Sequence, residues 1–184
     1  MCRESKLITL SRRSGQTMDF EIRRCTEEDL QDILKLQLKV YEDLCDPGLY
    51  ALVSEEDIHE SLLHDYCYGT YHDGRLVGFT MMIANRISHR NYGSYLGFSD
   101  ERQSKCVSME ISLVDREYRG FGLQKLYVAL REEIARREGA EEALVTIAPR
   151  NDYSLNNLVD SGYEIILTEP LYEGAMRHIL SKKL

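Results

Sequence analysis

The sequence predicts a mixed α/β (α+β) fold, with one mostly antiparallel sheet of about six or seven strands, helices on both faces and a single parallel strand pair. Two observations lead to this prediction. Segments with the two-residue period of strands alternate with segments of helical period. Strand, helix and strand then follow one another over residues 106–148 with short links, and such a βαβ unit makes its two strands parallel.

Length, charge and cysteine content limit the class of protein. A chain of 184 residues has the size of one domain, and we expect a single domain over residues 18–184 after an N-terminal extension, residues 1–17, that could be mobile. The net charge of −8 argues against nucleic acid as a partner. Five cysteines without a C-x-x-C pair fit a reducing, cytoplasmic location. No apolar run reaches the roughly 18 residues of a membrane span, so we expect no membrane partner.

The first half of the chain predicts a strand, two helices and a hairpin. The expected ranges are a strand at residues 20–24, a helix from the cap Thr26 to about residue 45, a helix from Ser54, and strands at 66–71 and 76–84. We expect Leu38 of the first helix and Leu63 of the second to face inward. Asp73-Gly74 suits a type I′ turn, in which both residues need positive φ. Residues 85–105 form a long connection, either a functional loop or a plain extended hairpin.

The second half predicts the βαβ unit, a short helix and a final pair of strands. The expected ranges are a strand at 106–114, a helix that begins after residue 122, a strand at 143–148, a short helix at 155–160, and strands at 163–168 and 175–180. Gly139 suits the position just after the end of the longer helix. Glu132 and Arg136 have the spacing of a favourable ion pair on that helix.

The stretch Met109–Gln124 carries most of the information about function. Its strand-like run ends at Val114, and a polar turn leads into R-G-F-G-L-Q, residues 119–124, which opens directly into the helix. The first N–H groups of a helix have no partner within it, and the helix dipole favours negative charge there. Gly120 and Gly122 let a phosphate approach the backbone where a side chain would collide. This turn is therefore predicted to bind an anion.

A run of motifs extends from this stretch: a hydrophobic strand, D-R-E-Y-R-G-F-G-L-Q, an amphipathic helix, a strand, and P-R-N-D-Y-S-L-N-N-L-V-D-S-G-Y. The order resembles the GNAT superfamily of acyl-CoA-dependent N-acetyltransferases, most specifically over residues 109–163. Arg119 and Gly122 match the first two fixed positions of the family's loop pattern, Arg/Gln-x-x-Gly-x-Gly/Ala, whereas Gln124 departs from the small residue usual there. The resemblance implies a GNAT-like sheet in which the two parallel strands splay apart.

The resemblance also implies acetyl-CoA as the co-substrate. The turn would wrap the diphosphate of coenzyme A, three strand residues would pair with the pantetheine arm through their backbone, and Asn151 of the second motif would contact the cofactor. The cofactor-binding residues expected are Ser112, Leu113, Val114, Arg119, Gly120, Phe121, Gly122, Leu123, Gln124 and Asn151. The five histidines show no metal-ligand spacing, so no metal is expected.

The expected reaction is acetyl transfer from acetyl-CoA to a primary amine by direct attack. An alkyl ammonium, with a pKa around 10, must lose a proton first, and a carboxylate can accept it. Glu110, on the same strand face as Val114, is the best candidate base and stands where several family members have one; alternatively it is solvated or paired with an arginine. Leu158 occupies the place of a tyrosine that protonates the thiolate in many members. Tyr153 or Tyr172 would then serve as the acid, or none is needed.

The sequence leaves the acceptor and two other functions open. A small-molecule or peptide amine fits the reaction, and Tyr92, Tyr95 and Phe98 either line an acceptor pocket or pack in a hairpin. A non-catalytic acyl-CoA-binding or sensor domain of the same fold is one alternative, which Leu158 suggests. A phosphate-loop nucleotide binder is another, although the G-x-x-x-x-G-K-[ST] motif is missing. A homodimer is possible, because dimers are common in the resembled family.

Overall fold

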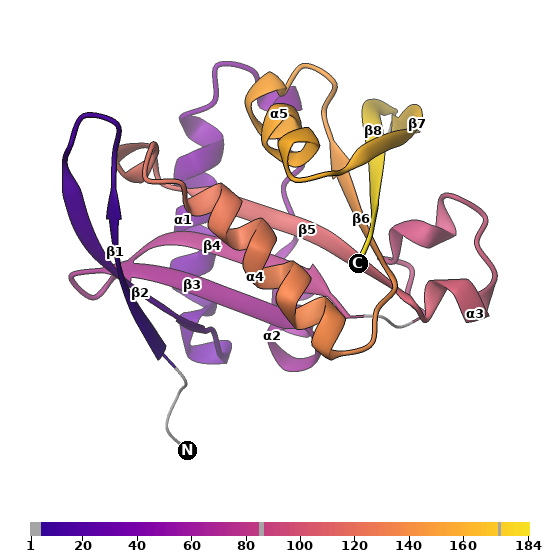
Figure 1. Ribbon diagram of the computed structural model, residues 1–184, viewed down its shortest axis with the longest axis horizontal. Helices are drawn as coiled ribbons and strands as arrows, with labels where there is room; N and C mark the ends of the chain where they lie inside the picture. Colours follow the sequence, from indigo (N-terminus) through magenta and orange to yellow (C-terminus); the bar gives the residue numbers. More distant parts are fainter. Residues whose placement is uncertain (1–4, 85–86, 173) are drawn as a thin grey trace. The chain divides into compact units, whose positions relative to one another are not determined.

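The computed structural model describes residues 5–84, 87–172 and 174–184 (Figure 1). Its strands are β1 (Ser5–Ser11), β2 (Thr17–Arg24), β3 (Tyr66–His72), β4 (Arg75–Ile83), β5 (Cys106–Val114), β6 (Glu142–Ile147), β7 (Glu164–Leu171) and β8 (Ala175–Lys183). Its α-helices are α1 (Leu30–Glu42), α2 (Glu55–His64), α3 (Asp100–Gln103), α4 (Leu123–Arg137) and α5 (Asp152–Asp160). Its short 3-10 helices are η1 (Glu27–Asp29), η2 (Pro47–Leu49), η3 (Tyr92–Ser94) and η4 (Arg116–Tyr118).

The strands of the described residues form one sheet in the order β1-β2-β3-β4-β5-β6-β8-β7. β5 and β6 are parallel, with Cys106 opposite Glu142 and Met109 opposite Val145. The pairs β1–β2, β2–β3, β6–β8 and β7–β8 are antiparallel. The prediction of a mixed, mostly antiparallel sheet with one parallel pair is therefore confirmed. The described part of the sheet has eight strands, against an expectation of about six or seven.

The strand that the sequence analysis missed is β1. The sequence predicts an extension over residues 1–17, but residues 5–11 pair with β2 along their whole length, from Ser5 opposite Arg23 to Ser11 opposite Thr17. Leu7 is 78% exposed, so β1 lacks the alternating buried face by which a strand is recognised in sequence. The expected start of the fold near residue 18 is thus too late for β1, and residues 1–4 lie outside the described residues.

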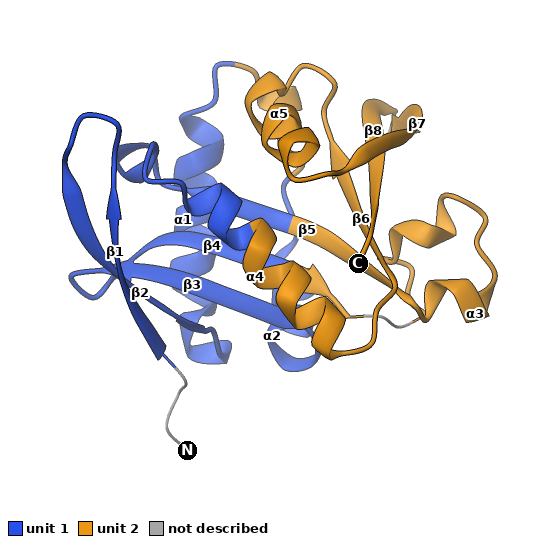
Figure 2. Ribbon diagram, viewed as in Figure 1, with its two compact units in different colours: residues 1–45, 52–81, 111–127 blue, residues 46–51, 82–110, 128–184 orange. Residues whose placement is uncertain are grey.

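Contacts divide the chain into two compact units (Figure 2). The first contains residues 1–45, 52–81 and 111–127, and the second contains residues 46–51, 82–110 and 128–184. The division passes through β5 and through α4, so each of these two elements contributes to both units. The single domain expected over residues 18–184 stays a prediction.

In the first unit, α1 and α2 lie on one side of the strands and the start of α4 lies on the other (Figure 1). An apolar cluster is buried there and consists of Phe20, Val77, Val114, Phe121, Leu123 and Tyr127. The Tyr127 hydroxyl lies 2.6 Å from Thr70 Oγ1, and it fills the space beside Gly78 that a Cβ atom would need. This cluster fixes the end of β5 and the first turn of α4, which carry the predicted anion site.

In the second unit, residues from η3, β5 and β6 form another apolar cluster. It consists of Tyr92, Cys106 and Leu144, with Leu96, Phe98 and Tyr172 packed against it. The connection between β4 and β5 contains η3 and α3, so the alternative of a plain extended hairpin is wrong; residues 85–86 lie outside the described residues. Asn91 stabilises this connection, because its side chain donates to Gln103 O at 2.9 Å and accepts from Gly93 N at 2.9 Å.

Local backbone predictions agree with the structure at three places. Thr26 forms a capping box with Asp29 before α1. Asp73 and Gly74 have φ values of +48° and +75°, as a type I′ turn requires. Gly139, two residues beyond the end of α4, has a φ of +78°. Each prediction depended on one or two residues whose backbone preference is strong, so tertiary packing did not change the outcome.

The predicted inward faces of α1 and α2 are partly wrong. Leu38 is 52% exposed and Leu63 is 49% exposed, and α1 ends at Glu42 and not near residue 45. Gln37 explains part of the shift in α1, because this polar residue is buried and its amide bonds both the O and the N of Val53, at 2.9 and 3.1 Å. A hydrophobic pattern cannot predict an inward position that a hydrogen-bonded glutamine occupies.

Candidate active site

The glycine turn before α4 has a backbone that glycine favours. Gly120 and Gly122 have φ values of +89° and +81°, a region in which side chains are strained. A Cβ atom on Gly122 would meet no protein atom within 4 Å. Glycine is therefore needed at position 122 for its backbone conformation, and the surface of the turn is open at this point.

The turn carries backbone donors that the described chain does not use. Among the described residues, none accepts a hydrogen bond from the N–H groups of Gly120, Phe121, Gly122 or Leu123. These donors lie at the N-terminus of the 15-residue helix α4, whose dipole places partial positive charge there. Consecutive free N–H groups on a glycine-containing turn form a concave site for a phosphate-like anion.

A buried carboxylate fixes the segment that leads into the turn. Asp115 has a fully buried side chain and pairs with Lys39 at 2.7 Å and with Arg75 at 2.9 Å. Its Oδ1 accepts from Glu117 N at 3.2 Å, which caps η4. The Asp115 N–H donates to Val77 O on β4 at 2.9 Å. These bonds hold the chain between β5 and α4 in one place before any ligand binds.

The side chains of the predicted cofactor residues have different surroundings. Phe121 and Leu123 are 3% and 2% exposed in the core of the first unit, so only their backbone can serve a ligand. Arg119 is exposed and its Nε donates to Val114 O at 3.2 Å. Gln124 is half-buried at the second position of α4.

The end of β5 extends beyond its parallel partner. The register with β6 ends where Met109 stands opposite Val145, whereas β5 continues to Val114. Ser112 is half-buried, and Leu113 and Val114 are buried, so these three residues offer mainly backbone groups. A strand segment beyond the paired register can bind an extended chain by adding a further strand to the sheet.

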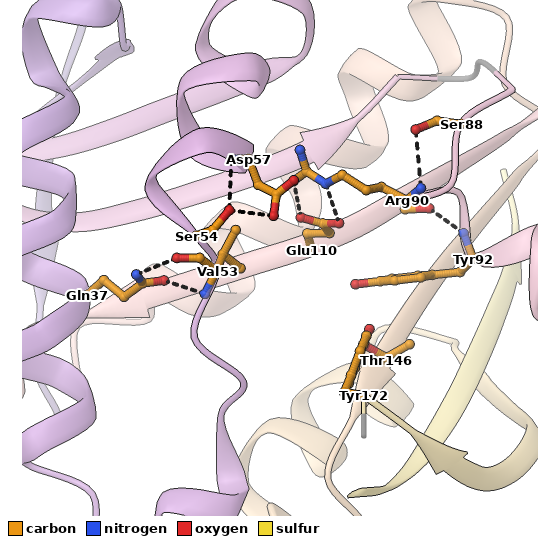
Figure 3. A network of polar contacts seen from close by, with 11 residues as sticks. Gln37, Val53, Ser54, Asp57, Ser88, Arg90, Tyr92, Glu110, Thr146 and Tyr172 are labelled. Carbon is orange, nitrogen blue, oxygen red and sulfur yellow. Dashed lines mark hydrogen bonds and ion pairs between the residues drawn. The ribbon is translucent and has the colours of Figure 1, made fainter. Parts of the chain in front are cut away.

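Glu110, the candidate base, is paired with an arginine in the second unit (Figure 3). Arg90 Nε donates to Glu110 Oε1 at 3.2 Å, and Arg90 Nη2 donates to Oε2 at 2.5 Å. Both side chains are nearly buried, at 7% and 11% exposed. This bidentate geometry corresponds to the second option for Glu110, a carboxylate held by an arginine. The pair gives the nearly buried carboxylate two charge-assisted hydrogen bonds.

The charge of Glu110 influences three tyrosines of the second unit. Burial, and to a smaller extent the charge of Glu110, raises the pKa of Tyr50. Burial is also the main cause of the raised pKa values of Tyr92 and Tyr172, and Glu110 contributes to both. Tyr172 Oη lies 2.9 Å from Thr146 Oγ1, and Figure 3 shows Tyr92 and Tyr172 beside Thr146. All three phenols are therefore neutral at physiological pH and able to donate a hydrogen bond or a proton.

The motif that contains Asn151, Tyr153 and Leu158 forms the cap and the body of α5. Asn151 is the N-cap of α5, and its Oδ1 accepts from Ser154 N at 3.2 Å. Tyr153 is 65% exposed in the first turn of α5, whereas Leu158 is 6% exposed. Of the two tyrosines considered as the acid, the structure brings Tyr172 into the group around Glu110 and shows no such contact for Tyr153.

Arg90, Tyr50 and Thr146 were not recognised as site residues from the sequence. Arg90 lies in a polar connection without a repeating pattern, and its partner is 20 residues away in the chain. The only available signal was the chemical argument that a strand glutamate needs either solvent or a cation. Thr146 joins the site through the hydroxyl of Tyr172, and Tyr50 through the effect of Glu110 on its pKa, and no local spacing encodes either relation.

In the described part of the chain, no group of three or more His, Cys, Asp or Glu side chains is placed to hold a metal ion. Within the same residues, no helix is long and apolar enough to cross a membrane.

The sequence matches the Acetyltransferase (GNAT) family over residues 30–162, which is more than half of the 184 residues. The chain belongs to the GNAT family of acetyltransferases. This match confirms the resemblance drawn from the motifs between Met109 and Tyr163, and it makes the protein an acyltransferase enzyme. No curated protein matches the sequence of this acetyltransferase.

Solved structures share the fold of this acetyltransferase. An acetyltransferase of the GNAT family from Streptococcus pneumoniae has a TM-score of 0.69 and 14% identity, covering 90% of this chain and 99% of that one. The PaiA N-acetyltransferase from Thermoplasma acidophilum, in complex with coenzyme A, has a TM-score of 0.65 and 16% identity, covering 91% of this chain and 100% of that one. A ribosomal-protein-alanine N-acetyltransferase from Brucella melitensis has a TM-score of 0.67 and 20% identity, covering 89% of this chain and 99% of that one. At these identities the likeness concerns the fold.

Proposed function

We propose that this acetyltransferase moves the acetyl group of acetyl-CoA to a primary amine by direct attack. The observation that carries the proposal is the set of four unused N–H donors from Gly120 to Leu123 at the N-terminus of α4. They suit the diphosphate of coenzyme A, which is the ligand of the structurally similar PaiA enzyme. Arg119 adds a positive charge beside them, and Gln124 contributes its backbone.

The pantetheine arm would bind along the end of β5. Its amide groups would pair with the backbone of Ser112, Leu113 and Val114, beyond the point where the register with β6 ends. Asn151 would supply the remaining cofactor contact that the family resemblance implies. Glu110 lies on the same strand, two residues before Ser112.

Glu110 would act as the general base. The acceptor arrives as an ammonium ion and must transfer a proton before its nitrogen can form a bond to the thioester carbon. Glu110 can accept that proton, directly or through water, if one of its two bonds from Arg90 opens. Arg90 then stays beside the protonated carboxyl group and stabilises its return to the charged form.

The C–S bond breaks when the tetrahedral intermediate collapses, and the electron pair leaves with sulfur. The nitrogen then loses its second proton, which replaces the proton that the thiolate takes up. A thiol with a pKa near 8.5 is an acceptable leaving group as thiolate. Tyr172 is the better placed proton donor for that thiolate, because it is neutral and lies in the group around Glu110. Tyr153 remains the alternative donor, with an exposed side chain that would have to move.

The test is the release of free thiol from acetyl-CoA in the presence of a broad panel of primary amines. We expect at least one amine to raise the rate well above hydrolysis and to appear in an acetylated form. A non-catalytic acyl-CoA-binding or sensor domain is the second candidate, favoured by Leu158 in place of the usual tyrosine. Tight binding of acetyl-CoA with no acetylated product from any amine would support that candidate instead.

A further inference from the structure

A positive charge from the N-terminal hairpin lies beside the glycine turn. Arg12 follows β1, and its side chain crosses Gly120, where a methyl group would meet Arg12 Cγ, Cδ and Nε at 3.7, 3.8 and 3.8 Å. The guanidinium carbon lies 4.4 Å from the centroid of the Phe121 ring. Hydrogen bonds from Arg12 N to Gln16 O and from Gly15 N to Arg12 O, at 2.8 and 2.9 Å, close the hairpin that carries it.

Among the described residues, the hydrogen-bond partners of the Arg12 guanidinium are neutral. Nη1 donates to Gln16 Oε1 at 3.3 Å, and Nη2 donates to the backbone oxygen of Glu117. Nε is buried and finds no hydrogen-bond partner in the described part of the chain. Among the described residues, no carboxylate forms an ion pair with Arg12. Because no described carboxylate neutralises this guanidinium, it can bind an anion, and its planar set of donors matches the geometry of a phosphate group.

We propose that Arg12 is a phosphate ligand for coenzyme A, supplied by the hairpin between β1 and β2. The inference rests on the proposed function, because it needs the cofactor on the Gly120–Leu123 turn. The diphosphate and the 3′-phosphate offer the same chemistry. The segment that the sequence suggests to be an extension is then part of the cofactor site.

The experiment compares R12Q with R13Q, since Arg13 is an exposed arginine on the same hairpin turn. Isothermal titration should give R12Q a Kd for coenzyme A about tenfold higher, with weaker salt dependence, and leave R13Q like the wild type. Dephospho-coenzyme A locates the contact: an equal loss with both ligands indicates the diphosphate, and a loss with coenzyme A alone indicates the 3′-phosphate. R12K should recover part of the affinity.

Two results would overturn the proposal that Arg12 binds a phosphate group of coenzyme A. An R12Q variant with the affinity and salt dependence of the wild type would overturn the proposal. A lower affinity with unchanged salt dependence would also overturn it, because that result indicates loosening of the turn and not loss of a phosphate contact. Absence of coenzyme A binding in the wild type would contradict the proposed function itself.

A separate observation in the second unit concerns the acceptor. Arg177 on β8 is 4% exposed, and its buried Nε has no hydrogen-bond partner among the described residues. Among the described residues, its guanidinium has a cation–π contact with Tyr172, with the guanidinium carbon 5.7 Å from the ring centroid, and it has no ion pair. A buried guanidinium without an anion is costly, so this side chain indicates a missing anionic partner.

The sheet register places Arg177 on the face that carries the proposed chemistry. Thr146 stands opposite Ile179, and Arg177 is two residues from Ile179, so Thr146 and Arg177 share a face. Tyr172 joins them, since its hydroxyl contacts Thr146 and its ring contacts Arg177. The same tyrosine is close enough to Glu110 for the carboxylate to raise its pKa, after the larger effect of burial.

We infer that the acceptor is a small amine that also carries a carboxylate, which Arg177 binds while the amine faces Glu110. This inference also rests on the proposed function, and it narrows the acceptor to zwitterionic amines such as free amino acids. A carboxylate fits the fork of a guanidinium, and it would form the ion pair that no described carboxylate forms with Arg177, although Glu169 stands opposite it in the register of β7 and β8.

The test uses matched pairs of acceptors, amino acids and their primary amides, in the thiol-release assay. We expect the wild type to prefer the acid at least tenfold in kcat/KM, and R177Q to lose that preference while it keeps its rate with the amides. R137Q, which changes an exposed arginine of α4, is the control. Equal rates with acids and amides in the wild type would overturn the inference while leaving the proposed function intact, and so would a preference that persists in R177Q.

Discussion

The pairing of Glu110 with Arg90 determines how a proton can leave the acceptor amine. A carboxylate that already accepts two hydrogen bonds from a guanidinium must take a proton on a remaining lone pair, or after one of those bonds opens. The pair also keeps a charged group in a nearly buried place, where an unpaired carboxylate would be costly. Glu110 can therefore be both a structural partner and a base, and only kinetics distinguishes the two roles.

Replacing Glu110 by glutamine should lower the rate of acetyl transfer by about 100-fold or more near neutral pH, because general base catalysis contributes on that scale. The variant should gain about tenfold in rate per pH unit below the pKa of the acceptor amine, since only the free amine then attacks. Thiol release measured across pH checks both statements. E133Q, an exposed glutamate of α4, serves as the control. An E110Q variant with the wild-type rate and pH profile would remove Glu110 from the mechanism.

A second residue-scale prediction concerns Asp29 in the first unit. Burial disfavours its charge, but hydrogen bonds from Arg23, Thr26 N and Tyr71 outweigh this effect and lower its pKa to about 2. In the unfolded chain an aspartate has a pKa near 3.9. Asp29 therefore stabilises the fold above about pH 4, and this contribution is lost as the pH falls toward 2.

Urea unfolding at several pH values tests this prediction. The free energy of unfolding of the wild type should fall between about pH 4 and pH 2 more steeply than that of D29N, which has no proton to gain at this position. Parallel curves for the two proteins would show that Asp29 does not titrate with a lowered pKa.

At the scale of single elements, α4 has a glycine with positive φ at each end. Gly122 and Gly139 have φ values of +81° and +78°, and an added Cβ would meet no atom within 4 Å at either position. The two sites therefore have the same backbone strain and the same free space. They differ only in their place, since Gly122 belongs to the proposed phosphate turn and Gly139 follows the opposite end of the helix.

Alanine at either position should cost about 1–2 kcal/mol of stability, because an L-residue is strained in that region. Only G122A should weaken the binding of acetyl-CoA, since a methyl group would occupy the space where the diphosphate approaches the backbone. Denaturant unfolding and calorimetric titration of the two variants make the comparison. Equal affinities in G122A and G139A would mean that the turn does not hold the ligand.

At the scale of the whole molecule, the sequence was most informative where one or two residues dictate the backbone. The Asp73-Gly74 turn, the cap at Thr26 and the parallel pair β5–β6 follow from local rules and agree with the structure. β1 was missed because its pairing with β2 depends on backbone bonds and not on a buried face. A strand of this kind has almost no pattern for sequence analysis to detect.

The candidate site shows the same division between local and tertiary information. The glycine turn is a local feature, so its position before α4 and its positive φ values could be anticipated. The partners of Glu110 could not, because Arg90 and Tyr172 reach it from distant parts of the chain. Residues 30–162 place the protein in the GNAT acetyltransferase family, but its particular acceptor depends on such tertiary contacts.

Ligand-induced stabilisation provides a prediction for the whole chain. A ligand at 100 times its Kd stabilises the folded state by about 2.7 kcal/mol, so acetyl-CoA should raise the melting temperature by several degrees. ATP, which lacks the pantetheine arm, should have a much smaller effect at the same concentration. A larger shift with ATP than with acetyl-CoA would favour the nucleotide-binding alternative.

The central claim is that the turn from Gly120 to Leu123 holds the donor by its diphosphate. A crystal structure of the protein with saturating acetyl-CoA tests it most directly. We predict diphosphate oxygens within hydrogen-bond distance of these backbone N–H groups and the pantetheine arm along Ser112–Val114. Electron density for acetyl-CoA elsewhere, with the turn unoccupied, would contradict the claim.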